Sequence, residues 1–261
     1  MKKTFAFLAA LAVSLLSFSA YAQEDKQVFN HVALGVSAGI DGLGVEAILP
    51  ATPFLQIRGG YSFFPYTYKN TLNLGQYEMN GKTIELNNIP LTASIWKGGL
   101  GKVLLDIYPG KTLPFHFVAG AFIGSGKLVG GCLDGSKAIP QEDYKTGIGM
   151  NGITISSDEK GMVYADAAVL KVLPYLGLGF GRGLNPNKRV TFSFELGVVY
   201  TGGIKATVYD YSNPSGVQSH VVTSKDLVAD DGKQMDDGII DKVSGIPVLP
   251  MMKLGLYVRL F

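Results

Sequence analysis

Eight short segments of the chain alternate hydrophobic and polar residues with a period of two, as β-strands with one apolar face do. The clearest is Val190 to Thr201, in which every second residue is large and apolar. The eight segments cover residues 31–39, 43–49, 54–64, 100–108, 114–124, 175–181, 190–201 and 251–261. This pattern predicts an all-β protein.

The connections between these segments run in a regular order of length: tight, short, long, short, long, short, long. The tight one is the Asp41-Gly42 turn, and the long ones span about residues 65–90, 125–171 and 202–249. If the strands run up and down, all three long connections leave at the same end. Transmembrane β-barrels place long loops outside the cell and short turns in the periplasm. A soluble secreted β-sandwich, the alternative, gives no reason for this sorting.

The last segment, Met251 to Phe261, places five apolar residues on one face: Met252, Leu254, Leu256, Val258 and Leu260. A strand that closes a barrel pairs with the first strand and leaves no open edge. We therefore expect a transmembrane antiparallel up-and-down β-barrel of eight strands with three long extracellular loops. Ten strands are the alternative, because residues 146–156 and 161–172 alternate weakly; we interpret these two as a hairpin above the membrane.

The amino terminus has the order of a secretory signal peptide: Lys2 and Lys3, an apolar stretch, then Ala20-Tyr21-Ala22. We expect cleavage after Ala22, which leaves residues 23–261 as one outer-membrane barrel domain. The apolar stretch is shorter than the ~20 residues that a transmembrane helix needs.

The net charge limits the possible binding partners, and the cysteine content limits the possible disulfides. The chain has 23 Lys and Arg against 21 Asp and Glu, so loss of Lys2 and Lys3 makes it formally neutral. That balance gives no basis for binding nucleic acid. Cys132 is the only cysteine, which excludes an internal disulfide, and we interpret it as a small residue in a glycine-rich loop.

Two phrases suggest a family: LPYLGLGFGRG, from Leu173 to Gly183, and VTFSFELGVVYTG, from Val190 to Gly203. With the signal peptide, the loop order and the aromatic carboxy terminus, the chain resembles small outer-membrane β-barrel proteins of Gram-negative bacteria, of the OmpX and OmpA-barrel type. The resemblance implies contact with outer-membrane lipids and recognition of the carboxy-terminal strand by the barrel-assembly machinery. One departure is that Arg259 occupies the third-last position and Phe261 is out of phase with the apolar face.

Charged residues gather in the inward phase of the predicted strands. An eight-stranded barrel is only wide enough inside for side chains to fill it. Charges that leave water there must pair, so we expect an interior salt-bridge network that plugs the lumen. The alternative is a charged constriction in a narrow pore. The predicted network consists of Glu46, Arg58, Lys102, Asp106, His116, Glu195, Lys253 and Arg259.

Two further clusters of polar residues do not indicate a catalytic site or a calcium site. His220 lies near Ser215, Ser219 and Ser224, but serine is common around any loop histidine, so we expect no catalytic site. The acids between Asp226 and Asp241 do not have the calcium-loop spacing, and we interpret them as a solvated acidic segment. We expect no metal and no cofactor.

Aromatic residues near the predicted strand ends suit the girdles at the two membrane surfaces. They are Tyr61, Phe63, Phe64, Tyr66, Tyr108, Phe115, Tyr175 and Tyr200. Together these expectations describe a non-enzymatic outer-membrane protein that acts as an envelope component or binds an extracellular ligand or host surface through its long loops. The rival functions are a small-solute pore and, third, a lipid-modifying enzyme.

Overall fold

A computed structural model describes residues 31–73, 75–79, 82–146, 148–150, 153–185, 187–213, 215–223, 242 and 244–260. The predicted signal peptide, the acidic residues from Asp226 to Asp241 and the terminal Phe261 lie outside this part of the chain.

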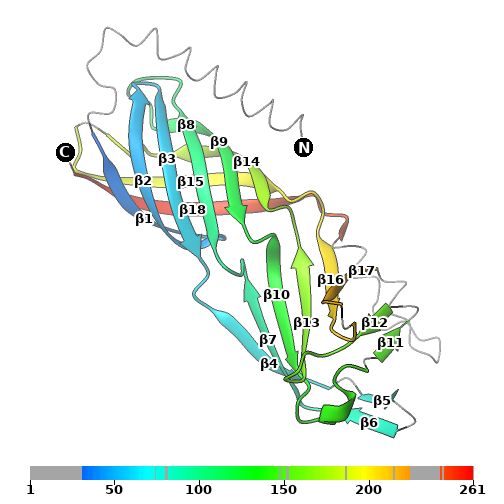
Figure 1. Cartoon of the computed structure of the whole chain (residues 1–261). Coiled ribbons are helices and arrows are strands. Elements are labelled where there is room, and N and C mark those ends of the chain that lie inside the picture. Colours follow the sequence, from blue (N-terminus) through cyan, green and yellow to red (C-terminus); the bar gives the residue numbers. More distant parts are fainter. Residues whose placement is uncertain are drawn as a thin grey trace.

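Eight antiparallel strands close into a barrel in the order β1-β18-β15-β14-β9-β8-β3-β2 (Figure 1). Their bounds are Ala33–Gly39 (β1), Gly42–Thr52 (β2), Leu55–Phe63 (β3), Leu100–Ile107 (β8), Phe115–Gly124 (β9), Val172–Phe180 (β14), Val190–Tyr200 (β15) and Val248–Arg259 (β18). Each predicted segment corresponds to one of these strands. The predicted eight-stranded barrel is therefore confirmed, and the alternative of ten strands is wrong.

The carboxy-terminal strand β18 closes the barrel. It pairs with β1 on one side, where Val36 lies opposite Leu256, and with β15 on the other, where Phe192 lies opposite Leu256. Because residues directly opposite each other share a face of the sheet, these three side chains form one apolar row. The first and last strands of the barrel thus leave no edge unpaired.

The outer surface of the barrel is apolar. On β15 and β18, the outward side chains with high exposure range from 39% at Val258 to 58% at Phe192. The residues between them, such as Gly255 and Lys253, are mostly buried and point inward. The period-two pattern therefore separates an apolar exterior from an interior that holds the buried charged residues.

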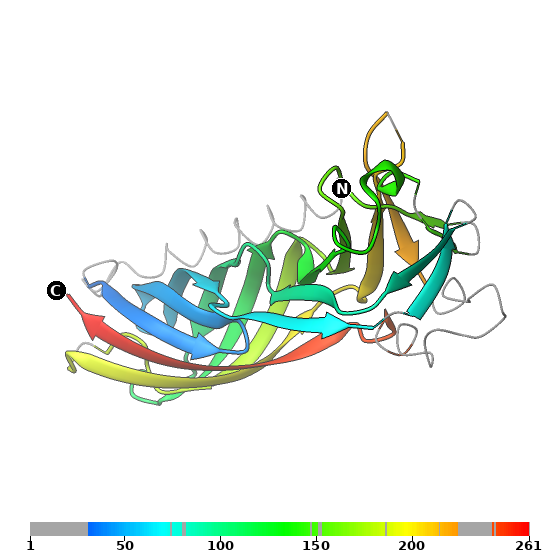
Figure 2. The same ribbon diagram turned by 90° about the horizontal axis from the view of Figure 1, so that it is seen from below.

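A second sheet of six strands extends from one end of the barrel, in the order β17-β16-β13-β10-β7-β4 (Figures 1 and 2). We call this end of the barrel the sheet end and the other the turn end. The six strands are Thr67–Leu72 (β4), Ile89–Ile95 (β7), Lys127–Asp134 (β10), Met162–Ala168 (β13), Lys205–Asp210 (β16) and Gln218–Val222 (β17). All three long connections contribute strands to it.

Smaller elements complete the sheet end. They are the paired strands Gly75–Met79 (β5) and Lys82–Leu86 (β6), the paired strands Ile148–Met150 (β11) and Ile153–Ile155 (β12), and the 3₁₀ turn Gln141–Asp143 (η1). Among the described residues, no helix has the length and apolar character to cross a membrane.

Two predictions for the long connections were wrong. Residues 146–156 and 161–172 do not form one hairpin: β11 pairs with β12, whereas β13 pairs with β10 and β16. Cys132 lies on β10, opposite Tyr164, and not in a loop. The reason is that β10 and β13 also pair with β7 and β16, which belong to other connections, and period-two alternation carries no information about such partners.

The junction between barrel and sheet is a sharp turn from β7 to β8. Trp96 has a left-handed φ of 47°, followed by Gly98 at 85° and Gly99 at 70°. The backbone N–H of Gly99 donates to the Trp96 carbonyl at 2.8 Å. Trp96 is 3% exposed, and its indole Nε1 donates to the Ile40 carbonyl at 3.3 Å. The turn therefore directs the indole into the sheet end of the barrel.

We expect replacement of Gly99 by Ala to destabilise the folded form by about 1–2 kcal/mol or more. A Cβ there would lie 2.2 Å from Tyr61 Oη and 2.7 Å from the Ser62 carbonyl oxygen, on a backbone of positive φ. The measurement is equilibrium unfolding in detergent. Gly59→Ala is the matched control, because a Cβ at Gly59 would meet no atom within 4 Å. Equal stability of the two variants would show that the junction turn is not rigid.

Candidate functional site

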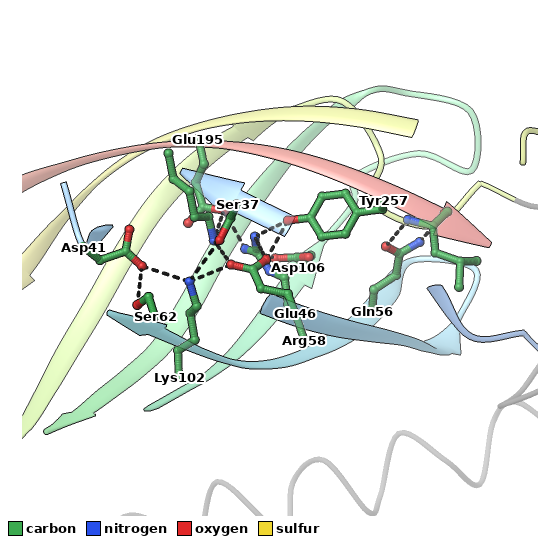
Figure 3. A network of polar contacts seen from close by, with 12 residues as sticks. Ser37, Asp41, Glu46, Gln56, Arg58, Ser62, Lys102, Asp106, Glu195 and Tyr257 are labelled. Carbon is green, nitrogen blue, oxygen red and sulfur yellow. Dashed lines mark hydrogen bonds and ion pairs between the residues drawn. The ribbon is translucent and has the colours of Figure 1, made fainter. Parts of the chain in front are cut away.

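The lumen of the barrel holds a cluster of charged side chains that come from five strands (Figure 3). The inward phase of β2 supplies Glu46, β3 supplies Arg58, β8 supplies Lys102 and Asp106, β15 supplies Glu195, and β18 supplies Lys253. None of these residues is more than 5% exposed. We call these six residues, with Asp41, the lumen network.

Arg58 lies at the centre of the lumen network. Its Nη2 is 2.5 Å from Glu195 Oε2 and 2.8 Å from Asp106 Oδ1, and its Nη1 is 3.4 Å from Glu46 Oε2. One guanidinium thus joins carboxylates from three strands that are far apart in the sequence. Arg suits this position because its planar group presents several donors at fixed angles.

Two lysines lie on the other side of Glu46. Lys102 Nζ is 2.7 Å from Glu46 Oε1, and Lys253 Nζ is 3.1 Å from the same oxygen. Lys253 also lies 3.4 Å from Glu195 Oε2. Three cations, Arg58, Lys102 and Lys253, thus form ion pairs with Glu46. Their attraction offsets the large desolvation free energy of a carboxylate buried in a barrel.

Sequence reasoning missed Asp41, because the tight Asp41-Gly42 turn by itself accounts for an aspartate there. Its Oδ2 is 2.8 Å from Lys102 Nζ and accepts a hydrogen bond of 2.8 Å from Ser62 Oγ. Asp41 is 1% exposed, so the turn directs its carboxylate into the lumen. With Asp41, the network contains four carboxylates and three cations.

Two tyrosines complete the hydrogen bonds of the network. Tyr257 donates to Glu46 Oε2 at 2.6 Å, and Tyr175 donates to Glu195 Oε1 at 2.7 Å. The interpretation of Tyr175 and Tyr108 as girdle residues was wrong, since they are 2% and 1% exposed inside the barrel. The available signal was their phase: Tyr108 shares the inward phase of Lys102 and Asp106, and Tyr175 shares that of Gly177 and Gly179.

Other aromatic residues of the predicted girdles do face outward. Tyr61, Phe63, Tyr66 and Tyr200 are each more than 45% exposed, and Phe115 is 37% exposed. Phe64 is half-buried.

Apolar side chains fill the lumen between the network and the six-stranded sheet. The cluster consists of Trp96, Leu100, Leu104, Val118, Phe122, Leu173, Tyr175, Val199 and Met251. Its members come from the junction turn and from five barrel strands. The rings of Phe122 and Tyr175 meet edge to face, with centroids 5.3 Å apart. This apolar layer lies inside the sheet end of the barrel.

The turn end is closed by a connection that folds inward. Gln56 Nε2 donates to the Leu184 carbonyl at 2.6 Å, and the Leu184 N–H donates back to Gln56 Oε1 at 3.2 Å. Leu184 is 2% exposed and packs with Ala33, Ile48 and Tyr257. The described side chains inside the barrel thus lie in three layers, of which the charged one is in the middle.

Two predicted members of the network lie elsewhere. His116 is buried beside it, with Nδ1 3.3 Å from the Pro114 carbonyl oxygen and its ring 4.7 Å from that of Tyr108. Arg259 lies at the turn end of β18, opposite Ala33, where its backbone N–H donates to the Arg189 carbonyl at 2.8 Å. It lies beyond Tyr257, and therefore at the rim rather than in the middle layer.

One group in the lumen has the ligand types for a metal ion. Ligand atoms of Asp106, His116 and Glu195 all lie within 4.8 Å of one another. The Arg58 guanidinium, however, bridges the two carboxylates at 2.8 and 2.5 Å. A divalent cation would have to displace this paired cation, so the arrangement favours an ion-pair network over a metal centre.

The residues considered for catalysis are not brought together. His220 and Ser219 are neighbours on β17, and successive side chains of a strand point to opposite faces. Ser215 lies before the strand, and Ser224 lies outside the described residues. On β10, burial raises the pKa of the Cys132 thiol, as does the nearby Asp158 charge, which makes this cysteine a weak nucleophile.

Comparison with known proteins shows only distant likeness. No protein-family model and no curated protein matches the chain. Among solved structures, CarO2 of Acinetobacter baumannii is 18% identical with a TM-score of 0.46, and the match covers 88% of this chain and 98% of that one. CarO of the same organism is 16% identical, with a TM-score of 0.46 and coverage of 90% and 99%. A major outer membrane protein from Thermus thermophilus is 13% identical, with a TM-score of 0.37 and coverage of 88% and 98%. Such likeness assigns no function to this chain.

We expect Arg58→Met to destabilise the folded barrel by about 3–5 kcal/mol, because it leaves buried carboxylates without their shared cation. Adding Asp106→Asn should restore part of that loss, since it removes one of the uncompensated charges. The measurement is the free energy of unfolding in detergent, read as a double-mutant cycle. Arg189→Met, at an exposed arginine of the turn end, is the control. If Arg58→Met and Arg189→Met were equally stable, the network would not hold the barrel together.

Proposed function

We propose that the protein is an outer-membrane β-barrel that conducts no solute and holds a six-stranded sheet at the cell surface, where the sheet serves as a structural or binding element. The apolar exterior supports the membrane location. Backbone groups in lipid must be satisfied internally, and a closed barrel does this without an edge. In water, the same exterior would expose a contiguous apolar area larger than soluble proteins usually expose.

The direction of insertion follows from the two ends. The turn end has short connections, and the sheet end carries the three long ones. Outer-membrane barrels place short turns in the periplasm and long connections outside. In this orientation the six-stranded sheet, with β5, β6, β11 and β12, lies outside the cell.

The observation that carries the proposal is the filled lumen. Arg58, Glu46 and Glu195 are joined by ion pairs across the barrel and are at most 3% exposed. A pore needs a connected path of water past these side chains. The apolar cluster around Trp96 and the inward turn at Leu184 add two further barriers. The geometry therefore favours an anchor over a channel.

The sheet has features of an interaction surface. Among the described strands, its edge strands β4 and β17 each have one neighbour, and an edge strand can pair with an extended segment. Aromatic side chains are exposed along and beside β4, with Tyr66 at 65% and Tyr68 at 48%. Exposed tyrosines are enriched in protein interfaces. A binding role for the sheet is consistent with both features.

We expect the purified protein to give no channel openings in planar lipid bilayers, because the lumen network blocks ions as well as solutes. Arg58→Ala/Lys102→Ala should raise the frequency of brief openings, since it removes two of the side chains that fill the middle layer. Lys205→Ala/Lys137→Ala, in the extracellular part, is the control and should stay silent. Regular openings of the unmodified protein would overturn the anchor proposal in favour of the pore.

We expect trypsin added to intact cells to cut only in the long connections. Exposed lysines there include Lys137, Lys145 and Lys160. The exposed Lys188 and Arg189 lie in a turn on the other side of the membrane and should be cut only after lysis. Fragment mapping by mass spectrometry distinguishes these sites. Cleavage in the Pro109 turn or after Lys188 in intact cells would contradict the topology.

A further inference from the structure

A recess of about 560 Å³ lies at the turn end of the barrel, between the β8–β9 and β14–β15 connections. Most of its polar lining comes from the two connections: Lys111, Thr112, Arg182, Asn185, Asn187 and Lys188. Among the described lining residues there are three cations and no carboxylate. The lumen network does not take part in this recess, which lies at the rim.

Arg182 gives the recess a fixed wall. Its Nη2 donates to the Pro53 carbonyl at 2.9 Å and to the Gly110 carbonyl at 3.5 Å, and its Nη1 donates to the Lys111 carbonyl. Its guanidinium carbon also lies 4.2 Å from the centre of the Tyr108 ring. One arginine thus ties three turn-end connections together. The positive charge is therefore held in place before any ligand arrives, which lowers the entropic cost of binding.

The recess also reaches the apolar exterior. Val190 and Phe192, the first outward side chains of β15, line it and are more than half exposed. Phe192 lines a second cavity as well, a groove of about 420 Å³ on the outer face of the barrel. This groove is bounded by side chains such as Val36, Val45 and Leu256 and by the small Gly44 and Gly255. A cationic recess and an apolar groove therefore meet at one residue.

We infer that recess and groove together bind one anionic phospholipid of the periplasmic leaflet, with its phosphate between Lys111 and Lys188 and an acyl chain along the groove past Phe192. The inference rests on the proposed membrane orientation, which places the turn end at the level of the periplasmic headgroups. Lysines act as point charges for phosphate, and basic pockets at a membrane surface select anionic headgroups. A free phosphate would use the recess alone and leave the groove without a role.

The test is native mass spectrometry of the folded full chain in mild detergent, titrated with phosphatidylglycerol or with phosphatidylcholine of identical acyl chains. We expect one phosphatidylglycerol to bind preferentially. Lys111→Gln/Lys188→Gln should weaken phosphatidylglycerol binding by roughly 20- to 30-fold. This follows because each lysine near an anionic headgroup contributes about 1 kcal/mol, and about 1.4 kcal/mol is a factor of ten in affinity. Lys137→Gln/Lys160→Gln, the same charge change at the sheet end, should bind as the unmodified protein does.

Three results would overturn the inference: equal binding of the two lipids, unchanged binding by Lys111→Gln/Lys188→Gln, or full competition by inorganic phosphate at equal concentration. The last would assign the recess to a soluble anion. A heat-dependent shift of the folded band in electrophoresis shows that each variant retains its barrel. If trypsin mapping confirms the orientation and the lipid preference is absent, only this inference fails. If mapping places the Pro109 turn outside the cell, the proposed function fails with it.

Discussion

The structure depends on the requirement that charges removed from water must be paired. A barrel of eight strands has no room for a water-filled passage, so every inward charge must find a partner on another strand. Arg58 meets this requirement by joining Glu46, Asp106 and Glu195, which lie on β2, β8 and β15. Such contacts hold opposite walls of the barrel together and fill the middle of its interior with side chains. The stability of the barrel and its proposed lack of conduction would therefore follow from one arrangement.

The apolar exterior and the filled interior together explain how the fold uses its two ends. Trp96 closes the sheet end because the left-handed turn at Gly98 and Gly99 directs its indole into the lumen. Leu184 closes the turn end because Gln56 holds its backbone through two hydrogen bonds. Because side chains occupy both ends of the barrel interior, the features open to partners among the described residues are the six-stranded sheet at one end and the basic recess at the other. This division supports the proposed anchoring role.

Much of the barrel could be predicted from the sequence, because period-two alternation states which residues face inward. That phase alone brought together Glu46, Arg58, Lys102, Asp106, Glu195 and Lys253. It failed for Asp41, where a turn directs a carboxylate into the lumen, and for Arg259, which has the inward phase but lies at the rim. The six-stranded sheet was missed because its strands pair across three separate connections. Alternation defines a strand's two faces but not its neighbours, and strands as short as these give a weak signal.

The proposed anchoring role requires that the lumen network leave no continuous path through the barrel, even for water. The most direct measurement is osmotic water permeability of liposomes that contain the oriented, full-length protein, followed by stopped-flow light scattering. A sealed barrel predicts the same permeability per unit area as protein-free liposomes of the same lipid and size. A permeability that rises in proportion to the amount of protein, with a low activation energy typical of a continuous water path, would contradict it.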